Sequence, residues 1–283
     1  MRKTFLFALL FTVLHSSAQT IRLNFMAGLS NYYGEIQTKK LTFDQSNPVF
    51  AVGATLDITN KLLLRSEYSF TKLQGDDKRG IYPTRNLNFK TYIQEGTLLL
   101  EYNLLDLYKK KLTPYVFSGV GLFRFSPYTT DSLNRKVYLQ GLSTEGQGFP
   151  EYPDRKIYRK TQFNIPIGGG LKYAISDDVQ FGFEYGLRIL LTDYLDDVSR
   201  NYVDQNILRN RAGQLAVDLS FRGDELKTGP ARTYPRAGSL RGSPRINDLY
   251  YYGLARLSIR MNWFENGMSS GRRSRLGCPA RVL

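Results

Sequence analysis

Apolar and polar residues alternate with a period of two along several stretches of the chain. The clearest stretch runs from Val179 to Ile189, where every odd-numbered position is apolar and every even-numbered position is Gly, polar or charged. A similar pattern occurs between Tyr251 and Trp263. An α-helix repeats every 3.6 residues and cannot place alternate residues on one side, so these stretches are predicted to be β-strands.

Eight such segments follow one another, separated by polar breaks. Their connections alternate in length. The breaks after the second, fourth and sixth segments are short, whereas the fifth runs from Ser126 to Lys160 and the seventh from Tyr194 to Leu249. The predicted strands are Ile21–Tyr33, Pro48–Leu56, Leu62–Leu73, Leu87–Tyr102, Pro114–Phe125, Thr161–Tyr173, Val179–Asp193 and Tyr250–Phe264.

This separation of short turns from long loops favours a membrane barrel over a soluble β-sandwich. Outer-membrane barrels keep short turns in the periplasm and long loops outside the cell, and their apolar faces contact lipid. A sandwich has no reason to sort its loops in this way. The sequence therefore predicts an all-β fold, an eight-stranded antiparallel transmembrane β-barrel of outer-membrane type with long extracellular loops, spanning residues 19–264.

The polar faces of the predicted strands carry both acids and bases. An eight-stranded barrel is just wide enough for its inward side chains to fill it. We therefore expect these charges to neutralise one another in a packed interior, in preference to a conducting pore or to acid–base chemistry by Glu101 and Glu184. The expected interior charge network is Arg65, Glu67, Glu101, Glu184, Arg188, Arg256 and Arg260.

Aromatic residues gather near the ends of the segments. Tyr32, Tyr68, Tyr92, Tyr185 and the run Tyr250–Tyr252 are examples. Such positions suit the two aromatic girdles of a membrane barrel, although Tyr and Phe favour any strand.

The N-terminus has the pattern of a secretory signal peptide. Arg2 and Lys3 precede an apolar run, and a small-residue site ends at Ala18. Residues 1–18 are therefore predicted to be a cleaved signal peptide, with a short buried helix as the alternative. The only His of the chain, His15, would leave with it.

Composition then restricts the chemistry of the mature protein. Without an imidazole, and with Cys278 as the only thiol, the chain excludes His-dependent nucleophilic catalysis and His-ligated metals. It also excludes cysteine-ligated clusters and internal disulfides. We therefore expect a protein that is not an enzyme and needs no cofactor. The chain is strongly basic, with 39 Lys and Arg against 25 Asp and Glu.

A basic tail follows the last predicted strand over residues 265–283. Because an even number of strands returns the chain to its starting side, this tail is predicted to lie in the periplasm. Its Gly and Arg content is typical of a flexible segment that orders on a partner. Its single Cys favours an intermolecular disulfide, with an incidental free thiol as the alternative. The predicted partner-binding residues are Arg272, Arg273, Arg275 and Cys278.

The seventh break is long enough to hold structure of its own. Residues 204–219 allow a short amphipathic helix interrupted near Gly213. A basic stretch, residues 222–245, follows. It could bind lipopolysaccharide phosphates or an acidic partner, and a mobile, solvated loop is the simpler expectation.

Three acids lie close together near the start of this break, Asp193, Asp196 and Asp197. Several carboxylates invite a calcium site, but the spacing and Gly of an EF-hand loop are missing. We expect these acids instead to cap the loop or to pair with basic residues such as Arg188 and Arg200.

Several stretches together resemble one known family: GLSNYYGE at residues 28–35, PYVFSGVG at 114–121, and TDYLDDVS at 192–199 followed by YVD at 202–204. They resemble a Bacteroidota family of small outer-membrane barrels that includes PorG, a component of the type IX secretion system. TDYLDDVS is the most specific stretch, and its motif residues are Asp193, Tyr194, Asp196 and Asp197. The resemblance implies association with the periplasmic ring formed by the lipoprotein PorK and by PorN.

Two functions follow. The first is a scaffold of the type IX machinery in the outer membrane of a Gram-negative bacterium, whose periplasmic side and Cys278 tail hold the ring lipoprotein. The alternative is a surface adhesin or ligand-binding barrel of the OmpA-like type that acts through its long loops. A lipid hydrolase is disfavoured because barrel hydrolases usually need a His, and no nucleic-acid partner is expected.

Overall fold

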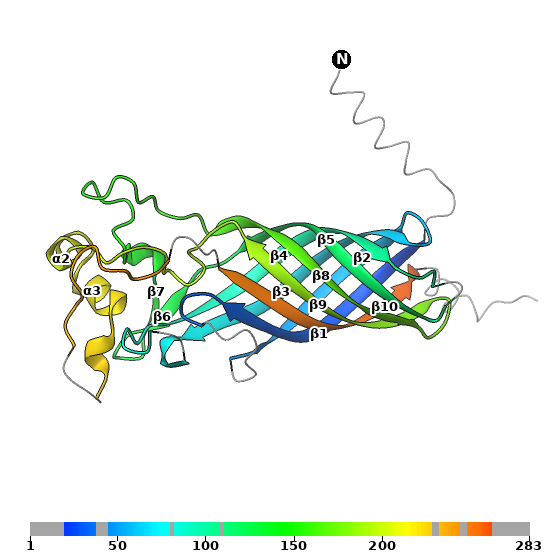
Figure 1. The fold of residues 1–283 in the computed structure, drawn as a ribbon, viewed down its shortest axis with the longest axis horizontal. Coiled ribbons are helices and arrows are strands. Elements are labelled where there is room, and N and C mark those ends of the chain that lie inside the picture. The colour runs from blue at the N-terminus through cyan, green and yellow to red at the C-terminus, as the bar shows by residue number, and fades with distance from the viewer. Residues whose placement is uncertain are drawn as a thin grey trace, which may run out of the picture.

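The computed structural model describes residues 20–37, 45–79, 82–107, 110–227, 232–243 and 248–261. Eight long antiparallel strands form a closed barrel (Figure 1). They are β1 (Ile21–Tyr33), β2 (Asn47–Asp57), β3 (Leu62–Asp76), β4 (Asn88–Asn103), β5 (Leu112–Arg124), β8 (Thr161–Ala174), β9 (Val179–Leu190) and β10 (Leu249–Arg260).

The barrel closes by pairing its first strand with its last. β1 runs antiparallel to β10 from Arg22 opposite Arg260 to Tyr33 opposite Leu249. Around the rest of the barrel each strand pairs with its neighbour in sequence, β5 pairing with β8 across the fifth connection. Closure gives each of the eight barrel strands a partner on both sides, which is what a sheet in a lipid bilayer requires.

The two faces of the strands have opposite chemistry. Alternate positions of β4 are buried and exposed from one end of the strand to the other. The inward positions of the barrel are mainly polar or charged, and the outward positions are mainly apolar. This is the arrangement of an outer-membrane barrel, whose apolar exterior contacts lipid. Outward apolar residues include Phe25, Leu29, Phe50, Val52, Leu98, Leu100, Val116, Val120, Phe163 and Phe183.

The long connections build a folded cap over one end of the barrel (Figure 1). The fifth connection contributes the hairpin β6 (Tyr128–Thr130) and β7 (Lys136–Tyr138) and the 3-10 helix η3 (Gln140–Leu142). The seventh contributes α2 (Gln205–Ala212), α3 (Gln214–Ser220) and the 3-10 helix η4 (Gly223–Glu225). The third contributes the 3-10 helix η2 (Asp77–Arg79).

The cap has an apolar core of its own. Val203, Leu208, Ala216 and Val217 are buried together, and aromatic side chains from both long connections pack against them. A second apolar cluster joins the cap to the barrel, since it includes Leu139 and Val198 from the cap and Phe123 and Tyr250 from the strands. The cap is therefore packed onto the rim of the barrel.

The predicted fold is confirmed. The predicted limits of β1 are those of the structure, and the largest differences are at the ends of β3 and β9. The predicted end of the last strand, residues 262–264, lies outside the described residues. The predicted helix with a break at Gly213 is present as α2 and α3. Asp204 caps α2 by accepting hydrogen bonds from the N–H groups of Asn206 and Ile207.

The aromatic girdles are only partly as predicted. Tyr68, Tyr92 and Tyr185 are exposed on the outside of the barrel. Tyr32 and the run Tyr250–Tyr252 are instead buried, and Tyr32, Tyr250 and Tyr252 belong to the cluster that joins the cap to the barrel. Tyr250 and Tyr252 share the buried face of β10 with Arg256, so their rings point into the barrel and not toward lipid.

Two further predictions lie outside the described residues. The signal peptide, residues 1–18, is one, and the tail, residues 265–283, with Cys278, Arg272, Arg273 and Arg275, is the other. Among the described residues, no helix combines the length and the apolar character needed to cross a membrane.

Candidate functional site

The middle of the barrel holds a network of ion pairs built around one guanidinium group. Arg65 of β3 is fully buried. Its Nη1 lies 2.9 Å from Glu101 Oε2 of β4 and 2.7 Å from Glu184 Oε2 of β9, and its Nε lies 2.7 Å from Glu67 Oε1. Three acids from three strands thus converge on one base.

Neighbouring strands supply the remaining charges at this level. Arg256 of β10 lies 2.9 Å from Glu101 Oε2 and 3.7 Å from Glu184 Oε2. Lys172 of β8 is ion-paired with Glu101. The hydroxyl of Tyr115 donates to Glu184 Oε2 over 2.7 Å. Charges from five strands are therefore locked together.

A second layer lies closer to the cap. Arg188 Nε is 3.5 Å from Glu95 Oε2, and its guanidinium carbon lies 4.0 Å from the ring centre of Tyr252. Glu95 also accepts hydrogen bonds from Asn164 and Ser69. Because Arg65, Glu101 and Arg188 are at most 1% exposed, the interior is packed at these levels and not water-filled.

The structure thus brings six of the seven predicted interior charges into two neighbouring layers. The seventh, Arg260, lies apart from them near the opposite rim, where its Nε is 3.5 Å from Asp178 Oδ1. The charge network predicted from the sequence did not include Glu95 or Lys172. Both lie on the inward face of predicted strands, so the alternation of those strands contained the signal.

The TDYLDDVS segment lies in the cap, directly above the barrel rim, and its acids point in different directions. Asp197 accepts hydrogen bonds from the Thr144 hydroxyl at 2.5 Å and from the Tyr158 hydroxyl at 2.8 Å. Its backbone carbonyl accepts from Arg241 Nη1 at 2.6 Å. Burial raises the pKa of Asp197 to about 6, against the opposing effect of Arg241.

Arg241 is the base that organises this part of the cap. It is buried and lies 2.9 Å from Glu145 Oε1. Glu145 also accepts hydrogen bonds from the backbone N–H groups of Ser199 and Arg200. Arg241 and Glu145 therefore link the fifth and seventh connections.

The expected partners of the motif acids were wrong. Arg188 lies inside the barrel with Glu95, and Arg200 forms a 2.6 Å ion pair with Asp154 on the surface. Sequence proximity suggested both, but the chain direction carries their side chains away from the three acids. The basic stretch after residue 221 also differs from the solvated loop expected, since Arg222 and Arg241 are buried in ion pairs.

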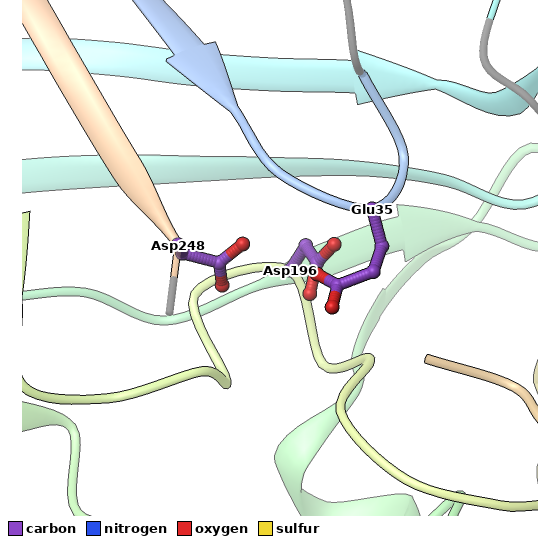
Figure 2. Close-up of side chains that lie close together, drawn as sticks. All are labelled: Glu35, Asp196 and Asp248. Carbon is purple, nitrogen blue, oxygen red and sulfur yellow. The ribbon is translucent and has the colours of Figure 1, made fainter. Parts of the chain in front are cut away.

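Asp196 faces a different set of groups, at the junction of cap and barrel. Figure 2 shows its carboxylate pointing toward those of Glu35, from the loop after β1, and Asp248, directly before β10. All three residues are buried, and one carboxylate oxygen from each lies within 4.8 Å of the others. Here we call these three residues the rim carboxylates. This is a geometry in which oxygen ligands could hold a cation.

The rim carboxylates have few positive neighbours. Burial raises the pKa of Glu35 to about 7. Burial, and then the charge of Glu35, raise the pKa of Asp196, while burial and then the charge of Asp196 raise that of Asp248. Nearby, Asp193 is buried too, and its pKa is raised to about 9 by burial and by Glu35.

The sequence did not predict that Glu35, Asp196 and Asp248 lie together. Asp193, Asp196 and Asp197 were considered there as one set, whereas the structure joins Asp196 to Glu35 and Asp248. A signal was present for one of them, because Glu35 is the last residue of the GLSNYYGE segment. The grouping itself depends on the loop after β1 meeting both ends of the seventh connection at the rim.

The chain matches one protein family and is similar to several solved structures. A family model described as a domain of unknown function, DUF6089, matches residues 2–219. No curated protein sequence matches the chain. Among solved structures, Neisserial surface protein A (NspA) is similar at 10% identity, over 87% of this chain and 100% of that one, with a TM-score of 0.42.

Two other solved barrels are similar at the same level. Ail, the attachment invasion locus protein of Yersinia pestis, was solved with the heparin analogue sucrose octasulfate. It shares 7% identity over 86% of this chain and 97% of its own, with a TM-score of 0.38. A major outer membrane protein from Thermus thermophilus shares 13% identity over 86% of this chain and 100% of its own, also with a TM-score of 0.38. These likenesses concern the fold alone.

Proposed function

The chain belongs to the family described as a domain of unknown function, DUF6089, and we propose that it is a non-enzymatic scaffold of the type IX secretion system in the outer membrane. Its barrel would hold a PorK/PorN-like ring lipoprotein beneath the membrane. The membrane barrel is a property of the fold, whereas the secretion role is supported by the resemblance of GLSNYYGE, PYVFSGVG and TDYLDDVS to the family that includes PorG.

The observation that carries the proposal is the packed, ion-paired interior. Arg65, Glu101 and Glu184 close the barrel at its middle, where a porin would have a water-filled lumen. Transport through this lumen would require breaking several buried ion pairs, each costly to disrupt. A barrel of this kind can act through its two ends and its lipid-facing wall, which suits a membrane anchor for other proteins.

The periplasmic end is where the ring partner would bind. The turns at this end are short, with Ile58–Lys61 and Ile175–Asp178 as examples. They offer little surface, so the basic tail, residues 265–283, is the segment proposed to reach the partner. Arg272, Arg273 and Arg275 would contact acidic groups, and Cys278 would form a disulfide with the partner.

Deletion of residues 265–283 tests this contact. We expect the shortened barrel to insert normally, judged by its heat-modifiable migration on gels, and to lose co-purification of the ring lipoprotein. A matched variant with Arg272, Arg273 and Arg275 changed to Gln should lose most of the partner as well. Full co-purification with the deleted protein would show that the tail is not the contact.

The disulfide is tested separately with Cys278→Ser. Native membranes are run on gels with and without reductant. A larger band that disappears with reductant, and in the variant, is expected. If the wild-type protein migrates as a monomer under both conditions, the disulfide is absent.

One observation favours a second candidate, a ligand-binding barrel that acts at the cell surface. The cap has its own apolar core, and a folded cap can present a fixed surface to a ligand. Replacing residues 205–220 by a short Gly-Ser linker would remove α2 and α3. Normal secretion in that strain, together with normal secretion after tail deletion, would favour surface binding over the scaffold.

A further inference from the structure

The rim carboxylates, with Asp193 beside them, form a group of buried acids that lacks bases. Within the described residues, no Lys or Arg nitrogen forms an ion pair with Glu35, Asp193, Asp196 or Asp248. The guanidinium groups of Arg85, whose charge acts on Glu35 and Asp196, and of Arg241 in the adjoining part of the cap are already engaged. Arg85 makes two hydrogen bonds to Asp77, and Arg241 pairs with Glu145.

One carboxylate oxygen of the group has no partner. Glu35 is 8% exposed, and its Oε1 accepts a hydrogen bond from the Ser243 N–H at 3.1 Å. Its other oxygen, Oε2, is buried without a hydrogen-bond partner in the described part of the chain. Figure 2 shows this carboxylate directed at Asp196. Leaving a buried charged oxygen unsatisfied is costly, so this atom points to a missing positive ligand.

The contacts of the Tyr32 hydroxyl also indicate that a positive charge is missing. It lies 2.7 Å from Asp196 Oδ2 and 2.7 Å from Asp248 Oδ1. A phenol has one proton and can donate to only one of these oxygens. The other contact brings two oxygens together without a hydrogen between them, unless a carboxyl proton or a cation supplies the positive charge.

The remaining oxygens are held in place by the backbone. Asp196 Oδ1 accepts from the Val198 N–H at 2.9 Å, and Asp248 Oδ2 accepts from the Leu195 N–H at 3.0 Å. Each of the three acids therefore has one oxygen fixed by a main-chain donor and the other turned toward the group. Side chains fixed in this way are prepared to bind a ligand without first being ordered.

We propose that Glu35, Asp196 and Asp248 bind one divalent cation, of which Ca²⁺ fits best, and that this ion fastens the extracellular cap to the barrel rim. Ca²⁺ binds oxygen at about 2.3–2.6 Å, so two of its ligands can be up to about 5 Å apart. The 4.8 Å limit among the ligand oxygens satisfies this condition. Mg²⁺ requires shorter, nearly octahedral contacts and fits less well.

The ion would join two connections of the chain, and the two acids it takes from the seventh connection lie near opposite ends of that connection. Glu35 follows β1, Asp196 belongs to the seventh connection, and Asp248 precedes β10. A single ion here would neutralise repulsion among the acids and tie the TDYLDDVS segment to the seam where β1 and β10 close the barrel. The ion site lies at the opposite end of the barrel from the proposed scaffold contact, so either can fail without the other.

The test uses the full mature chain, refolded in detergent, treated with EDTA and dialysed. Isothermal titration with CaCl₂ should show one binding event per chain, and MgCl₂ should bind more weakly. Ca²⁺ should also protect the cap from protease. Absence of binding heat and of protection would overturn the proposal, since the acids would then be neutralised by protons.

Two variants and one control locate the site. Asp248→Asn and Glu35→Gln keep side-chain size and should each weaken Ca²⁺ binding at least about tenfold. Asp131→Asn is the control, because this acid of the fifth connection pairs with Arg135 and not with a rim carboxylate. Binding that is unchanged in both rim variants would also overturn the proposal. The wild-type titration decides whether the ion binds even if one variant fails to fold.

Discussion

The barrel interior and the rim at the base of the cap both bury several acids, but they differ in how charge is balanced. The two interior layers contain Glu67, Glu95, Glu101 and Glu184 together with Arg65, Lys172, Arg188 and Arg256, so acids and bases are equal in number. At the rim, Glu35, Asp193, Asp196 and Asp248 are buried without an ion pair within the described residues.

The difference shows two ways of burying carboxylates. In the interior, each acid forms an ion pair with a base that also points into the barrel, and the arrangement needs nothing from outside the chain. At the rim, backbone N–H groups and Tyr32 orient the acids, but the charge must be supplied by protons or by a bound cation. Changes in pH and in Ca²⁺ concentration should therefore affect the stability of the cap and leave the barrel interior unchanged.

The largest effect is expected when the interior loses its central base. Arg65→Met leaves Glu67, Glu101 and Glu184 without their shared partner and should lower the free energy of unfolding by about 3–5 kcal/mol. Urea unfolding in detergent, followed by heat-modifiable migration, measures the change. The double variant Arg65→Met/Glu184→Gln should recover part of the loss. Equal stability of wild type and single variant would show that the network is not needed.

A smaller and local effect is expected from the base of the cap. Arg241→Met removes the ion pair with Glu145 and the hydrogen bonds to the carbonyls of Asp197 and Ser220, costing about 3 kcal/mol within the cap. Limited proteolysis should cut the cap faster while the barrel stays intact. Arg236→Met, at an exposed position, is the control and should leave the cleavage rate unchanged.

The stability of the cap should depend on pH, which gives a further difference between the rim and the barrel interior. In EDTA, the pKa of Glu35 is raised from 4.5 to about 7 and that of Asp193 from 3.8 to about 9. Acids with raised pKa values favour the folded cap fully at pH values below about 4. That contribution is lost as the pH rises through about 7 for Glu35 and about 9 for Asp193.

Proteolysis of the cap in EDTA should therefore quicken from about pH 4 to about pH 9, while the barrel remains resistant. Added Ca²⁺ should remove most of this dependence. Cleavage that slows as the pH rises would contradict the assignment of raised pKa values at the rim.

The smallest effect is expected at a surface ion pair of the same cap. Arg200 and Asp154 lie 2.6 Å apart, but their side chains are 38% and 67% exposed. Asp154→Asn should change the stability of the cap by less than about 1 kcal/mol, because solvent screens such pairs. If Asp154→Asn destabilised the cap as much as Arg241→Met does, the greater exposure of the Arg200–Asp154 pair would not explain a difference from the Arg241–Glu145 pair.

The strands could be predicted from the sequence because the bilayer imposes a simple rule on each of them. Every outward side chain must be apolar, so a period of two is visible in single segments such as Val179–Leu190. The interior acids and bases follow from the same period. Which acid pairs with which base could not be predicted in the same way. Arg260, for example, was assigned to the network although it lies near the opposite rim with Asp178.

The cap was predicted only in part, for a physical reason. Hydrophobic spacing located α2 and α3, but nothing in that spacing indicated a joint core between the fifth and seventh connections. Tyr250–Tyr252 were expected at an exposed girdle and are buried, and Tyr250 and Tyr252 pack in the cluster that joins the cap to the barrel. Loops have no fixed period, so their contacts depend on where the barrel places their ends.

The sequence by itself determined a closed, eight-stranded membrane barrel with charges inside, since lipid outside and a narrow interior leave few other ways to satisfy this pattern. Only the tertiary structure decided which acids meet. Glu35, Asp196 and Asp248 are separated by long stretches of chain, and they come together because barrel closure sets β1 beside β10 and the cap folds back over that seam.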